Sequence, residues 1–136
     1  DQELIPVVKQ KSAVIRDHYN ELVMQVSGGY ALVFRSYDDG IAWRWETSFK
    51  DIITIYGEDV SFSFPGDYKI YFPEEQSMFS HQEREYLHIP LSGVTPQRFC
   101  SIPALADLPE GVKIALTEAD LFDYPGMYLT DVNFKK

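Results

Sequence analysis

The chain has 136 residues, about the size of one domain, and its 45% hydrophobic and 15% aromatic residues are enough to bury a core without disulfides. Twelve Lys and Arg against twenty-one Asp and Glu give a formal net charge of -9, which argues against nucleic acid and membrane surfaces as partners. The same carboxylates suit metal cations or neutral polyols such as sugars, although most acidic proteins are acidic only for solubility.

A single cysteine, Cys100, excludes an internal disulfide and leaves no second thiolate for a zinc site. No apolar run approaches the roughly 20 residues that a bilayer span needs, and residues 1–10 have no signal-peptide pattern. The chain begins at Asp1 instead of Met, so we expect either a processed product or a part of a larger protein.

Helix is expected to be scarce. The stretch 11–22 has helix-compatible residues, but its apolar positions Ala13, Val14 and Ile15 are clustered instead of spread at a spacing of 3.6. We expect at most one or two short helical turns.

The strongest local signal is a β-hairpin. Two β-prone, aromatic-rich runs, Tyr30–Tyr37 and Ile41–Glu46, flank a turn at 38–40 in which Gly40 is expected to supply a positive φ. Because side chains alternate along a strand, Trp43 and Trp45 share a face, and we expect them to pack in a core instead of stacking on sugar.

Asp38 and Asp39 fit the chemistry of this turn and need no catalytic role. Further β-type runs follow at Ile52–Tyr56, Val60–Phe64 and Tyr68–Phe72, with turn residues between them. Such spacing is typical of a β-meander in a sandwich or barrel.

The polar stretch Ser77–Tyr86 lacks periodicity and predicts an exposed loop. A second hairpin is predicted where Arg98–Ile102 and Val112–Thr117 bracket the turn sequence Leu108–Gly111. The expected fold class is therefore mainly β, an antiparallel β-sandwich.

The segment Thr117–Tyr128 has three carboxylates followed by a Tyr-Pro-Gly turn. In a structural interpretation, Thr117 caps one helical turn together with Asp120, and Asp123 fixes the loop. In a functional one, Glu118 or its neighbours give oxygen to a hard cation, which needs further ligands from elsewhere. Spacing alone favours the structural interpretation.

Other candidates are weaker. The three histidines, His18, His81 and His88, are too dispersed for a local metal motif and are expected to be surface or hydrogen-bonded residues. Cys100 is expected to be a small buried hydrophobe instead of a nucleophile. No P-loop, dinucleotide fingerprint, nucleophile elbow or zinc motif is present.

Two stretches, Phe34–Trp45 and Leu116–Leu129, resemble the N-terminal domain of glycoside hydrolase family 97, in matching order. The turn at 108–112 fits as well, so the resemblance covers roughly residues 19–129. It implies a β super-sandwich of the galactose-mutarotase-like kind, followed by a catalytic (β/α)₈ barrel and a small C-terminal β domain. Members resemble α-glucosidases and α-galactosidases of the bacterial periplasm.

In such enzymes a glutamate of the N-terminal domain reaches the barrel site and helps to bind calcium, and the matching position is Glu118. The resemblance thus implies that residues 1–136 are a single noncatalytic β-sandwich domain, excised from a larger multidomain enzyme. Its partner is the catalytic barrel of the same protein, which takes a carbohydrate substrate and supplies the catalytic carboxylates.

A free-standing carbohydrate-binding or protein-interaction module remains the alternative, and it gains if Trp43 and Trp45 are both exposed. An autonomous enzyme is disfavoured by the length of the chain and by the lack of a recognisable nucleophile.

Overall fold

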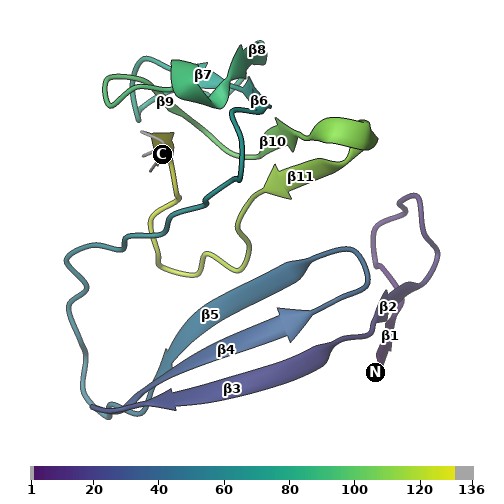
Figure 1. Ribbon diagram of the computed structural model, residues 1–136. Coiled ribbons are helices and arrows are strands. Elements are labelled where there is room, and N and C mark those ends of the chain that lie inside the picture. The colour runs from purple at the N-terminus through teal and green to yellow at the C-terminus, as the bar shows by residue number, and fades with distance from the viewer. Residues whose placement is uncertain (1, 131–136) are drawn as a thin grey trace. The chain divides into compact units, whose positions relative to one another are not determined.

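The computed structural model describes residues 2–130 (Figure 1). The chain forms two compact units, one ending at Gly57 and the other beginning at Glu58. All strand pairs are antiparallel, which confirms the predicted mainly β class. The sandwich arrangement stays a prediction.

The first unit contains a two-stranded ribbon and a three-stranded sheet. The ribbon pairs β1 (Gln2–Leu4) with β2 (Ile15–Asp17), and the sheet has the order β3 (Asn20–Val26), β4 (Tyr30–Ser36), β5 (Ile41–Thr47). Its three strands run side by side in Figure 1. The strand β3 was not among the predicted elements, although the alternating apolar residues Leu22, Met24 and Val26 are a strand signal in the sequence.

The predicted hairpin is confirmed as β4 and β5, with Ser36 opposite Ile41. The Tyr37 N–H donates a hydrogen bond of 2.8 Å to the Gly40 carbonyl. Gly40 itself does not have a positive φ, so this part of the prediction is wrong. A four-residue loop is commonly built around a type I turn, which does not need the positive φ of a two-residue hairpin turn.

One face of the three-stranded sheet is apolar on every strand. The pairing of Phe34 with Leu22 and Trp43 identifies its apolar members as Leu22, Met24, Val26, Tyr30, Leu32, Phe34, Ile41, Trp43 and Trp45. Asn20, Ser36 and Thr47 lie at the ends of the same face. Leu32 and Phe34, on the central strand, are half-buried and the others are exposed. Trp43 is 41% and Trp45 is 53% exposed, so their predicted packing in a core is wrong within the described residues.

The segment between the two units differs from the prediction. Residues 48–68 contain no strand, so the predicted strands Ile52–Tyr56 and Val60–Phe64 are wrong. Ile52 and Tyr56 are fully exposed. β-Propensity expresses how a side chain fits a pleated, half-buried surface, and these residues have no such surface to pack on.

The second unit contains two small sheets. The first has the order β11 (Lys113–Leu116), β10 (Ala104–Asp107), β6 (Lys69–Phe72), β8 (Leu87–Pro90), and the second has β12 (Leu129–Thr130), β9 (Phe99–Cys100), β7 (Glu74–Glu75). The predicted strand Tyr68–Phe72 is confirmed as β6.

The second hairpin is confirmed at its turn, but its first strand is β10. A single 3₁₀ turn at Pro109–Gly111 connects the strands, and the Leu108 N–H bonds the Val112 carbonyl at 2.8 Å. Of the predicted strand Arg98–Ile102 only the short β9 forms, and it pairs with β7 and β12. Pro103, which has no N–H for a ladder, separates β9 from β10.

The other short helix is a 3₁₀ turn at Leu91–Gly93, and residues 11–22 contain no helix. Two single turns agree with the expected scarcity of helix. In residues 2–130 no helix has the length and apolar character needed to cross a lipid bilayer.

The core of the second unit forms because the side chains of a strand alternate between the two faces of the sheet. Ile70 and Phe72 on β6 are buried, whereas Lys69 points to the other side. The buried cluster contains Ile70, Phe72, Leu91, Val94, Cys100 and Ala104. Cys100 is fully buried, and burial raises the pKa of its thiol to about 12, which confirms its expected role as a buried hydrophobe.

Besides Glu75, which is described below, three carboxylates of this unit have pKa values below their usual range because hydrogen bonds stabilise the ionised form. Arg98 donates to Glu74 at 2.5 and 2.9 Å, and the Ser92 hydroxyl and N–H donate to Asp67. Lys113 and, less strongly, His88 lower the pKa of Asp107.

We expect that replacing Phe72 by Ala lowers the free energy of unfolding by about 3–5 kcal/mol, because a fully buried ring leaves a cavity. Urea denaturation followed by circular dichroism measures this. The matched control is Phe79→Ala, since Phe79 is 99% exposed and its loss should change stability by less than ~0.5 kcal/mol. Equal effects of the two substitutions would contradict the assigned core.

Stability should also depend on acid. A carboxylate whose pKa is lowered by folding stabilises the native state above its unfolded pKa of about 4, and this stabilisation is lost as the pH falls through the lower folded value. We therefore expect the urea midpoint to fall between about pH 5 and pH 2, and to fall less in a Glu74→Gln, Asp107→Asn double variant. An equal acid dependence in both proteins would show that these contacts are not its source.

Candidate functional site

The segment 117–128 connects β11 to β12 and contains no helix. Asp120 and Asp123 have left-handed backbone conformations, with φ of 63° and 54°. The Phe122 N–H bonds the Asp120 carbonyl at 3.0 Å, which marks a tight turn. The predicted helical turn capped by Thr117 and Asp120 is therefore wrong. Asp is one of the few residues whose short polar side chain tolerates this conformation.

Glu118 is half-buried, and one of its carboxylate oxygens is fixed by the returning backbone. The Met127 N–H donates a hydrogen bond of 2.7 Å to Glu118 Oε1. Gly126 lies beside it, and a Cβ built there would be 3.4 Å from the same oxygen. The turn lies at residues 122–123 and not at the predicted Tyr124–Gly126, and the chain after it brings residues 126–127 back to the carboxylate. The bond leaves Oε2 without a hydrogen bond from the described residues.

Two tyrosine hydroxyls fasten the segment. Tyr124 donates to Glu58 Oε2 at 2.8 Å, and this bond raises the pKa of Tyr124. Tyr128 donates to the Met78 carbonyl at 2.9 Å and accepts a bond of 3.2 Å from Gln82 Nε2. The Tyr128 ring also makes an edge contact with Phe99, with centroids 5.7 Å apart.

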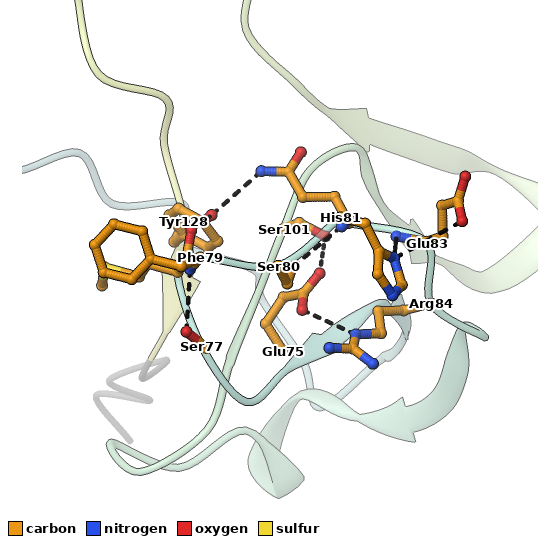
Figure 2. A network of polar contacts seen from close by, with 11 residues as sticks. Glu75, Ser77, Phe79, Ser80, His81, Glu83, Arg84, Ser101 and Tyr128 are labelled. Carbon is orange, nitrogen blue, oxygen red and sulfur yellow. Dashed lines mark hydrogen bonds and ion pairs between the residues drawn. The ribbon is translucent and has the colours of Figure 1, made fainter.

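Residues 77–86 have no regular secondary structure, which confirms the predicted irregular loop, and Figure 2 shows the network at its base. The Glu75 carboxylate is buried and accepts bonds from Arg84 Nε at 2.9 Å and from Ser101 Oγ at 3.2 Å. Burial alone would raise the pKa of Glu75, but the hydrogen bonds from Arg84, Ser80 and Ser101 together hold it below the usual value. Glu75 is thus a buried anion at neutral pH.

Sequence reasoning missed this network because its members come from three separate stretches of the chain. The pair Glu74–Glu75 follows β6 after one residue, Pro73, and that position next to a partly buried strand was the available signal. An open cleft of about 620 Å³ lies beside the network and is lined by Glu74, Glu75, Gln76, Arg84, Glu85, Leu87, Gln97 and Phe99. Glu118 does not line this cleft, so the cleft and the predicted ligand are separate features.

Within residues 2–130 no group of three or more His, Cys, Asp and Glu side chains is arranged to hold a metal ion. The histidines do not converge. His81 Nδ1 accepts a bond of 3.1 Å from the Glu83 N–H, and His88 Nε2 lies 3.1 Å from Asp107 Oδ2 while its ring stacks on Tyr71. These two are the expected hydrogen-bonded histidines, and His18 is an exposed residue next to β2.

Asp38 and Asp39 lie in the exposed β4–β5 loop, as expected for turn residues. The structure thus places the predicted Glu118 in a segment that Tyr124 and Tyr128 fasten, together with Thr117, Asp120 and Asp123.

The model of the glycosyl-hydrolase 97 N-terminal family matches residues 1–136. A curated relative, a retaining alpha-galactosidase of Bacteroides thetaiotaomicron, is 32% identical over 137 residues, which cover 94% of this chain and 21% of the relative. The chain spans about a fifth of the length of that relative. By the extent of the family match and the identity to this relative, the chain belongs to the N-terminal family of glycosyl hydrolase 97.

Proposed function

We propose that this chain is a noncatalytic N-terminal β domain of a family 97 α-glycosidase, that it packs on the catalytic barrel of the same protein, and that Glu118 is a calcium ligand there. The observation that carries the proposal is the anchored Glu118 carboxylate in a chain of this family. The full protein hydrolyses α-galactosidic or α-glucosidic bonds, and the barrel supplies its catalytic carboxylates.

The geometry of Glu118 supports a ligand shared with another domain. Calcium takes six to eight oxygen ligands, and one anchored carboxylate supplies at most two of them. The hydrogen bond from Met127 orients the carboxylate through Oε1 while Oε2 stays available. Calcium affinity should therefore be weak in this chain alone and should require the oxygens of the barrel.

Exposed apolar side chains near Glu118 support a buried position in the full protein. Leu121 is 43% and Phe122 is 83% exposed, in the same segment as the carboxylate. Apolar side chains gathered on an exposed segment are typical of surfaces that another protein layer covers. We place this layer in the barrel domain.

The exposure of Trp43 and Trp45 favours the alternative, a free-standing carbohydrate-binding module. The surroundings of the two rings argue for protein packing instead. Sugar sites combine an aromatic ring with a few polar groups that bond the hydroxyls. The residues that pair with these tryptophans on the neighbouring strand, Phe34 and Leu32, have none, and the Tyr30 ring makes an edge contact with Trp45. An apolar sheet face of this kind suits a second protein layer.

We place the full enzyme in the periplasm or outside the cell, as the family resemblance implies. Cys100 suits an oxidising compartment because a fully buried thiol with a raised pKa is a poor partner for disulfide exchange.

In the intact protein, Glu118→Gln should weaken calcium binding by about tenfold or more, because an amide oxygen replaces an anionic ligand. Isothermal titration calorimetry with calcium measures the affinity, and hydrolysis of a nitrophenyl α-galactoside or α-glucoside measures activity. Asp123→Asn is the matched control, since Asp123 lies in the same segment and should leave affinity unchanged. Unchanged affinity and activity for Glu118→Gln would leave only a structural role for this residue.

The sugar-binding alternative is tested by fluorescence, since Trp43 and Trp45 are the two tryptophans of the chain. We expect no saturable change in their emission with melibiose or maltose up to about 10 mM, the range of weak sugar affinities. A saturable change that disappears in Trp45→Ala would favour the free-standing module instead.

A further inference from the structure

The position of Glu118 cannot come from a backbone ladder, because residues 117–128 lie outside the strands. Two residues of the segment, Asp120 and Asp123, are held in left-handed conformations, which persist only where surrounding contacts determine them. A ligand shared between domains must also be held to within about 0.5 Å of its productive position. The contacts that fasten this segment therefore decide whether Glu118 is ready to bind.

Tyr128 makes the most connected of these contacts. It follows Met127, whose N–H fixes Glu118 Oε1, and it precedes β12, which pairs with β9. Its hydroxyl uses both its donor and its acceptor capacity, donating to the Met78 carbonyl and accepting from Gln82 Nε2. Its ring rests edge-on against Phe99.

The loop that Tyr128 contacts is held by its own hydrogen bonds, which are drawn in Figure 2. Three side chains of this loop each accept a bond of 3.1 Å from the backbone N–H two residues ahead. Ser77 accepts from Phe79, Ser80 from Gln82 and His81 from Glu83. Such local bonds fix a loop that has no ladder of its own. At its base, buried Glu75 holds Arg84 and Ser101.

We infer that Tyr128 is a positioning residue for Glu118. Its hydroxyl connects the segment 117–128 to the loop 77–86, and through that loop to the buried Glu75 anion. These contacts fix the position in which the Met127 N–H bonds the Glu118 carboxylate. The inference rests on the proposed role of Glu118 as a calcium ligand. Residues that orient a metal ligand through another group typically change affinity by 10–100-fold when they are lost.

The test is Tyr128→Phe in the intact protein, which removes both hydrogen bonds of the hydroxyl and keeps the ring against Phe99. We expect calcium affinity to fall about tenfold, and activity to return to the wild-type level when calcium is raised to saturation. Hydrogen exchange at the Met127 amide should become faster. The matched control is Tyr86→Phe, because Tyr86 also donates one hydroxyl bond, to the Pro103 carbonyl at 3.1 Å.

The outcomes separate the two proposals. If Glu118→Gln weakens calcium binding and Tyr128→Phe does not, the inference is overturned and the proposed function stands. If Tyr128→Phe lowers activity that excess calcium does not restore, the residue is merely structural and the inference is again overturned. If Glu118→Gln has no effect, the proposed function fails, and the positioning role of Tyr128 is judged by hydrogen exchange at the Met127 amide alone. Faster exchange in Tyr128→Phe than in Tyr86→Phe upholds this role, and equal exchange in the two variants overturns it.

Discussion

The packing of the second unit depends on the buried carboxylate of Glu75. A charge removed from water is tolerated only when hydrogen bonds and an opposite charge surround it, and Arg84, Ser80 and Ser101 meet that need from both sides. Because Arg84 lies in the irregular loop 77–86 and Ser101 follows β9, the hydrogen bonds to this one anion fix two separate stretches of chain. The loop 77–86 then offers Tyr128 its partners, the Met78 carbonyl and the Gln82 side chain.

This arrangement explains how an irregular segment presents a carboxylate. Within residues 2–130 the strands β9 and β12 pair over two residues each, which is too short to fix the path of residues 117–128. Side-chain hydrogen bonds take over where the ladder ends, from Tyr124 to Glu58 and from Tyr128 to Met78. The result is a carboxylate with one anchored oxygen, a geometry that suits donation to a cation held mainly by other groups.

The first unit poses a complementary problem, since its sheet has an apolar face that the described residues leave largely exposed. Antiparallel sheets commonly keep one face in water, but that face is then polar. Here the row Leu22, Phe34, Trp43 is apolar on all three strands.

Local chemistry in the sequence determined the β class, the hairpin of β4 and β5, the turn at Pro109–Gly111 and the irregular loop 77–86, because each depends on alternation or turn residues within a few positions. Motif resemblance also singled out Glu118. Tertiary structure alone decided that Ile52–Tyr56 and Val60–Phe64 are not strands, since a strand needs a partner and a surface. It also decided that Glu75, Arg84 and Ser101 meet around one buried charge, and that Thr117 starts no helix, because long-range bonds from Tyr124 and Tyr128 overrode the local capping signal.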